Sequence, residues 1–135
     1  MPGKRLILRA DGASLGNPGP AAIGVIIENE RGQAVARISR PIGKTTNNRA
    51  EYLALIAGLE EAARLGGQEL DIKLDSQLIV RQLQGRYRSR KLSPLYRQAV
   101  EIMQKFNSCT VEHVPSSENR TAHALAHRAL RKASS

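Results

Sequence analysis

The sequence predicts an α/β protein in which helices pack on a mixed five-stranded sheet, in the order βββαβααβα. Two observations lead to this prediction. The first three apolar runs are separated only by short turn segments, so they should form antiparallel neighbours. Two later runs each follow a helical segment, and strands reached in this way join a sheet in parallel by right-handed crossovers. The expected sheet therefore has three antiparallel and two parallel strands.

The first part of the chain alternates extended segments with turns. Residues 4–11 form an apolar run that predicts a buried strand, and the Gly/Pro/Asn-rich segment 12–20 predicts a turn. Residues 21–30 and 33–42 are rich in Ile and Val and predict two further strands. The intervening segment Asn29–Gly32 is typical of a hairpin turn.

Helical spacing dominates the rest of the chain. The clearest helix spans 48–65, because its apolar residues recur at helical spacing and Gly66-Gly67 ends it. The other predicted elements are a strand at 69–74, helices at 76–84 and 92–106, a strand at 109–114, and a helix at 118–131.

The composition is that of one globular domain, which we expect to span residues 1–135. Only 3% of the residues are aromatic, so the core must be built from Leu, Ile, Val and Ala. Cys109 is the only cysteine, which excludes an intramolecular disulfide. The first apolar run ends at Leu8, too early for a signal peptide, and no stretch approaches transmembrane length. We therefore expect a cytoplasmic monomer.

The net charge of +9 indicates a polyanionic partner, and nucleic acid is the usual one for a small basic domain. The alternative is a generally basic surface without a specific partner. An anionic membrane is disfavoured, because no basic amphipathic helix stands out in the sequence.

Three carboxylates occupy positions that can converge. Asp11 and Asp75 each close an apolar run, and Glu51 lies where the 48–65 helix begins. Two strand ends and a helix start can meet at one point of such a sheet. Three converging carboxylates repel one another unless a cation lies between them, and Mg²⁺ sites for phosphate chemistry have this composition.

Each carboxylate also has a purely structural interpretation. Asp11 with Gly12 is compatible with an ordinary turn. Glu51 lies three residues after Asn48, which matches the spacing of a capping box. Asp75 is compatible with the N-cap of a helix that starts at the next residue. The three together are harder to explain in this way.

Several phrases of the chain occur in one order: Asp11-Gly12, Gly16-Asn17-Pro18-Gly19-Pro20, Thr46-Asn47-Asn48 leading into Glu51, Asp75-Ser76-Gln77, and His113-Val114-Pro115 with Asn119, Ala122, Leu125 and Ala126. Together they resemble the type 1 ribonuclease H family, over roughly residues 5–131. The resemblance implies a ribonuclease H-like fold and cleavage of the RNA strand of RNA–DNA hybrids with two ions of Mg²⁺ or Mn²⁺. One ion would activate the attacking water and the other would stabilise the leaving 3′ oxygen.

The resemblance also implies roles for individual residues. Asp11 would bridge both ions, Glu51 would help to hold the second, and Asp75 would hold the first. Positions where the family contacts sugar, base edge and phosphate in the minor groove correspond to Asn17, Thr46, Asn47 and Gln77. Asn and Gln side chains both donate and accept, which suits 2′-hydroxyls and minor-groove edges. Turn and cap chemistry is the alternative role of Asn17 and Asn47.

The sequence departs from the family pattern at the fourth acid, where His123 stands in Ala122-His123-Ala124-Leu125-Ala126. A neutral imidazole can ligate a divalent metal, but it brings no negative charge and favours Mn²⁺ over Mg²⁺ more than Asp would. We expect His123 to be a catalytic metal ligand, and the alternative is a solvated helix residue. His127 lies four residues on, but the residues between are all apolar and a zinc hydrolase is disfavoured.

The chain also lacks the long basic loop of many family members and resembles the compact subgroup. A short basic patch remains, which we expect to contact the DNA strand: Arg86, Tyr87, Arg88, Arg90 and Lys91. The alternative is a solvated linker between two helices.

Three functions are compatible with these features. The leading one is an active hybrid nuclease. The second is a hybrid-binding module whose catalysis is weak because His123 replaces an acid. The third is a nuclease with the same fold that acts on another nucleic acid.

Overall fold

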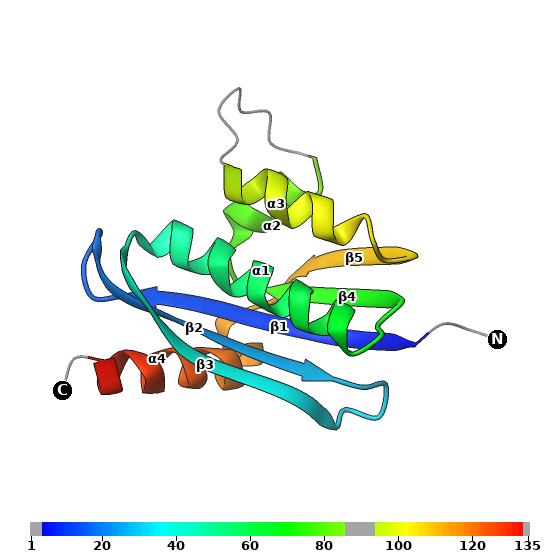
Figure 1. Cartoon of the computed structure of the whole chain (residues 1–135), viewed down its shortest axis with the longest axis horizontal. Coiled ribbons are helices and arrows are strands. Elements are labelled where there is room, and N and C mark those ends of the chain that lie inside the picture. Colours follow the sequence, from blue (N-terminus) through cyan, green and yellow to red (C-terminus); the bar gives the residue numbers. More distant parts are fainter. Residues whose placement is uncertain (1–3, 86–93, 134–135) are drawn as a thin grey trace.

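The computed structural model describes residues 4–85 and 94–133 (Figure 1). Its elements in chain order are β1 (Arg5–Ser14), β2 (Gly19–Glu28), β3 (Ala34–Thr45), α1 (Asn47–Arg64), β4 (Glu69–Leu74), α2 (Gln77–Leu83), α3 (Pro94–Met103), β5 (Ser108–His113), the 3₁₀ turn η1 (Ser116–Glu118) and α4 (Arg120–Ala133). Within these described ranges, no helix combines the length and apolarity needed to cross a membrane.

The strands form one five-stranded sheet in the order β3-β2-β1-β4-β5. β1 and β3 are antiparallel to β2, while β4 pairs in parallel with both β1 and β5. The predicted mixed sheet is therefore confirmed. The hairpin between β2 and β3 also forms as expected, because the Gly32 amide donates to the Asn29 carbonyl over 3.0 Å.

The turn after β1 is shorter than the sequence indicated. We expected a turn over 12–20, but β1 continues to Ser14 and β2 begins at Gly19. The extra pairing is possible because Gly12 lies opposite Ile23 and Ala13 opposite Ala22, so small residues extend the antiparallel ladder. Asp11 consequently lies within a strand and not at its end.

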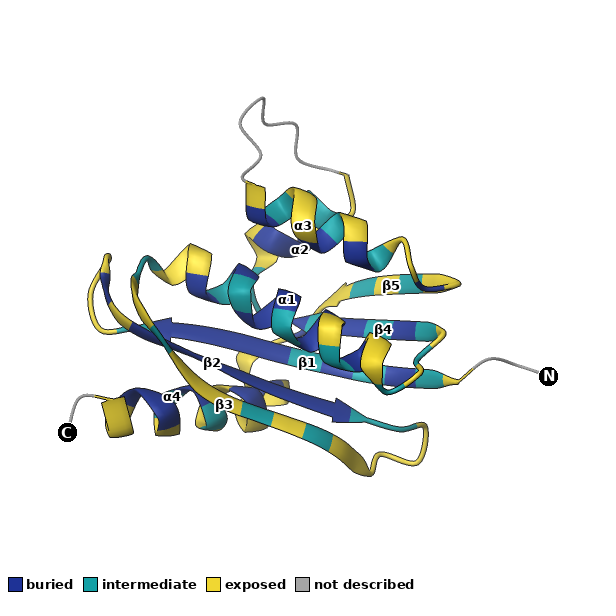
Figure 2. Ribbon diagram, in the orientation of Figure 1, coloured by how far each residue is buried: buried dark blue, intermediate teal, exposed yellow. Residues whose placement is uncertain are grey.

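Helices cover both faces of the sheet (Figure 1). A large apolar cluster joins one face, through residues such as Leu8 and Val25, to α1, α2 and α3. A smaller cluster on the other face joins Ala13 and Ala22 to α4. Figure 2 shows β1, β2 and β4 as mostly buried strands between these layers, whereas much of β3 is exposed.

The central strands are offset in a way that opens one end of the sheet. The last pair between β1 and β4 joins Arg9 to Lys73, and β4 ends one residue later. β1 continues for five residues beyond Arg9, paired with β2. This stretch of β1 lacks β4 as a neighbour, which leaves room beside it for side chains from other elements.

Candidate active site

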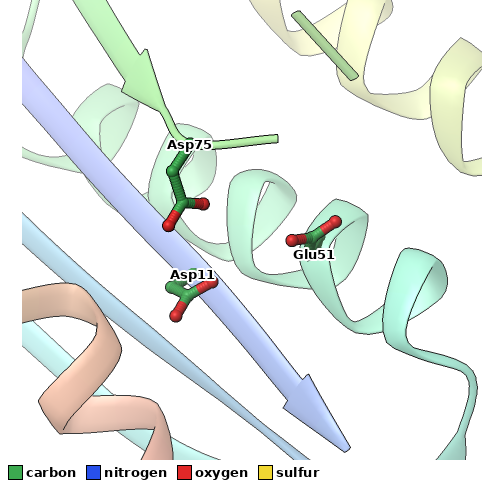
Figure 3. Close-up of side chains that lie close together, drawn as sticks. All are labelled: Asp11, Glu51 and Asp75. Atoms are coloured by element: carbon green, nitrogen blue, oxygen red, sulfur yellow. The ribbon is translucent and has the colours of Figure 1, made fainter. Parts of the chain in front are cut away.

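Three carboxylates meet at the open end of the sheet. Asp11 projects from β1, Asp75 follows the last residue of β4, and Glu51 lies early in α1 (Figure 3). One oxygen from each carboxylate lies within 4.8 Å of the others. The predicted convergence of two strands and a helix is present, although the three residues are far apart in sequence.

Local hydrogen bonds argue against the purely structural roles of Glu51 and Asp75. Thr46 is the N-cap of α1, because its hydroxyl accepts from the Arg49 amide over 3.3 Å. Ser76, not Asp75, is the N-cap of α2, and its hydroxyl accepts from the Ile79 amide. Neither carboxylate is therefore used to cap a helix.

Gly12 allows α1 to approach β1 closely enough for this convergence. A Cβ atom at residue 12 would lie 2.2 Å from the Ala50 carbonyl carbon and 2.4 Å from the Glu51 nitrogen. Any larger residue would push α1 away from the strand. The glycine after Asp11 thus fixes the distance between Asp11 and Glu51.

Burial and mutual repulsion make the carboxylates hard to ionise. Burial, followed by the charge of Asp75, raises the pKa of Asp11 to about 6, although the contact with His123 opposes this shift. Burial, followed by the charges of Asp11 and Asp75, raises the pKa of Glu51 to about 7. A divalent cation between the carboxylates would relieve this repulsion.

His123 reaches the same site from the opposite face of the sheet. Its Nδ1 lies 2.9 Å from Asp11 Oδ2, which makes a hydrogen bond or, when the ring is protonated, an ion pair. α4 can approach this closely because Gly24 lacks a side chain: a Cβ there would lie 2.0 Å from the Ala122 carbonyl oxygen. The ring of His127 lies against that of His123, with centroids 4.1 Å apart.

Asn119 ties the start of α4 to the strand that holds Asp11. Its side chain is fully buried, and its Nδ2 donates to the Ala10 carbonyl over 3.0 Å. The Asn119 Oδ1 has no hydrogen-bond partner among the described residues. The bond to Ala10 fixes the backbone one residue before Asp11.

These groups surround a cleft of about 440 Å³. Its lining is Asp11, Gly12, Ala13, Ser14, Asn47, Glu51, Asp75, Ser116, His123 and His127. Ser14 and Ser116 were not expected here from the sequence, and His127 was considered only for a zinc hydrolase. A polar residue beyond the expected end of a strand gives no signal until the strand is known to continue.

Comparison with known proteins agrees with this architecture. A family model described as reverse transcriptase-like matches residues 9–129. A ribonuclease HI of Halobacterium salinarum is 43% identical over 95% of this chain. The chain belongs to the type 1 ribonuclease H family.

Two further relatives place the chain among ribonucleases H. A bifunctional protein of Mycobacterium tuberculosis is 39% identical over 93% of the chain. The chain spans only 35% of that protein and 65% of the Halobacterium protein. A ribonuclease H1 isolated from compost, solved in complex with an RNA/DNA hybrid, superposes with a TM-score of 0.89 at 38% identity, covering 96% of this chain and 99% of the other.

The residues expected to contact substrate in this ribonuclease H-like chain are only partly assembled. Asn47 lines the cleft, and Asn17 Oδ1 accepts from its backbone amide over 3.0 Å. Thr46 caps α1, and Gln77 is the exposed first residue of α2; neither lines the cleft. The basic patch lies outside the described residues, namely Arg86, Tyr87, Arg88, Arg90 and Lys91.

Proposed function

We propose that this chain is a metal-dependent endonuclease that hydrolyses the RNA strand of RNA–DNA hybrids. The convergence of Asp11, Glu51 and Asp75 within 4.8 Å is the observation that supports this proposal most. Family membership supports the reaction class, and the hybrid bound to the compost ribonuclease H1 supports the substrate class. The net charge of +9 is consistent with a polyanionic substrate.

The donor set fits Mg²⁺ or Mn²⁺, because both ions prefer oxygen ligands and tolerate several carboxylates. We propose that two ions are held, with Asp11 shared between them and Glu51 and Asp75 each assigned to one. When bound, such ions supply a nucleophilic water at neutral pH and stabilise the leaving oxygen. The raised pKa values of Asp11 and Glu51 are consistent with a site that needs cations to keep its carboxylates charged.

The remaining residues would position the hybrid. Asn47 lies on the wall of the cleft and Asn17 is bonded to its backbone, so both are placed for minor-groove contacts. We assign Thr46 and Gln77 to the edge of this surface and the basic patch at 86–91 to the DNA strand. Phosphate contacts of this kind position the substrate without reading its sequence.

His123 is proposed as the fourth group of the site, a weaker substitute for an acid. Its 2.9 Å contact with Asp11 supports this assignment. The same substitution supports a second candidate function, a hybrid-binding module with weak or no catalysis. Imidazole adds no negative charge to a site that must hold two dications.

Cleavage of a labelled RNA–DNA hybrid tests the proposal, with duplex RNA and duplex DNA measured alongside. The parent should cleave the hybrid in the presence of Mg²⁺ or Mn²⁺ and should lose activity in a chelator. Asp75→Asn should lower the rate about a thousandfold, since losing a ligand costs about 4 kcal/mol of transition-state stabilisation. Glu60→Gln, at an exposed position of α1 outside the cleft, is the control and should match the parent.

Each outcome of this experiment distinguishes the candidates. Hybrid binding without cleavage in either metal would favour the binding module. Equal cleavage of duplex RNA or DNA would favour a nuclease of different specificity. A near-normal rate for Asp75→Asn would refute the assignment of the carboxylates.

A further inference from the structure

α4 presents two histidines to the cleft, one helical turn apart. Residues four positions apart lie on the same face of a helix, so His123 and His127 are neighbours. Their ring centroids lie 4.1 Å apart, with the ring planes tilted by 39°. Both rings line the same cleft as the three carboxylates. The cleft therefore has an oxygen-rich wall and a nitrogen-rich wall.

Asp11 orients one of these two rings. Asp11 Oδ2 lies 2.9 Å from Nδ1 of His123, the geometry in which a neutral ring donates its Nδ1–H to a carboxylate. A carboxylate in this position fixes the tautomer and leaves the lone pair on Nε2. The same arrangement of carboxylate, imidazole and metal is common where histidine binds an ion.

Ligand chemistry distinguishes this wall from the carboxylate cluster. Imidazole suits Ni²⁺, Cu²⁺ and Zn²⁺, whereas carboxylates suit Mg²⁺ and Mn²⁺. We propose that His123 and His127 form a separate site for a nitrogen-preferring divalent transition-metal ion, with Asp11 as the group that orients His123. Water molecules in the open cleft would complete the coordination of the ion.

Neighbouring charges act on this site in opposite directions. The carboxylate of Asp11 attracts a cation through the His123 ring. Arg131 lies close enough to influence His127 electrostatically, and its positive charge opposes binding. The two ligands are thus expected to give a site of modest strength, specific for ions that prefer nitrogen.

Occupancy of this site has a consequence that rests on the proposed function. His123 cannot serve both the carboxylate cluster and a transition metal held with His127. Binding of Ni²⁺ should therefore withdraw His123 from the hydrolytic site and lower Mg²⁺-supported cleavage. The experiment that tests the site itself needs no catalysis.

Calorimetric titration with Ni²⁺ in saturating Mg²⁺ measures the site directly. The parent should bind Ni²⁺, and His127→Gln should lose that binding. Ala124→Gln places the same side chain at an exposed position of α4 and should bind like the parent. Asp11→Asn should weaken the affinity by about 10–100-fold, because it removes the group that orients His123.

The titration also separates this site from the carboxylate cluster. Glu51→Gln should retain Ni²⁺ binding, since Glu51 lies outside the histidine pair. His123→Gln provides a second ligand deletion if His127→Gln does not fold. Absence of Ni²⁺ binding by the parent, or binding that survives in the histidine variants and is lost in Glu51→Gln, would overturn the proposal.

Discussion

Replacing Glu51 with glutamine should make the metal-free protein more stable while it lowers hydrolysis. Glu51 is half-buried beside Asp11 and Asp75, and its pKa is raised from 4.5 to about 7. A shift of this size corresponds to about 3 kcal/mol against the charged form, and solvent screening of a partly exposed group reduces it to about 1–2 kcal/mol. Glutamine has nearly the same shape and does not bear this electrostatic cost.

The effect should depend on pH with a defined sign. A carboxyl whose pKa is raised in the folded protein favours folding below its unfolded pKa and loses that contribution as pH rises through the folded value. The parent should therefore lose stability between pH 4.5 and about 7. The advantage of Glu51→Gln should be full at pH 8 and should disappear near pH 4.5.

Urea unfolding in EDTA at pH 8 and at pH 4.5 measures this difference. At pH 8 the variant should gain about 1–2 kcal/mol, which corresponds to a rise in Tm of about 4–8 °C for a domain of this size. Glu60→Gln makes the same substitution at an exposed position of α1 and should change stability little. Equal or lower stability of Glu51→Gln at pH 8 would refute the inference that the carboxylates repel one another.

Further predictions concern His123, Gly12 and the basic patch. His123→Asp should raise Mg²⁺-supported cleavage and His123→Ala should lower cleavage in Mg²⁺ and Mn²⁺; rates equal to the parent in both metals would make His123 a bystander. Gly12→Ala should destabilise the protein by about 1–3 kcal/mol and reduce hybrid cleavage, because its Cβ would lie 2.2 Å from the Ala50 backbone and displace Glu51; thermal unfolding and the cleavage assay measure both effects. Neutralising the basic patch should reduce the salt dependence of hybrid binding by about one unit of slope for each phosphate that is no longer neutralised, and an unchanged slope would indicate a solvated linker, for Arg86, Arg88, Arg90 and Lys91.

Local sequence patterns were sufficient for the topology. Short turns between the first three strands require antiparallel pairing, and helices before β4 and β5 require parallel pairing. The carboxylates were also identifiable, because acidic residues that close apolar runs or begin a helix gather at one edge of such a sheet. The ends of β1 and β2 were not identifiable, since small turn-forming residues such as Gly12 also pair in a ladder once a partner strand lies opposite.

The sheet topology, the family and the three carboxylates follow from the amino-acid sequence, because periodicity and residue type are properties of each segment. The groups that surround the carboxylates depend instead on how the segments pack. The contact between His123 and Asp11 joins residues 112 positions apart, and it requires α4 to pack closely over Gly24. The bond from Asn119 to the Ala10 carbonyl requires the same packing. Distances between elements are set by the side chains between them, and no periodicity within one segment encodes that distance.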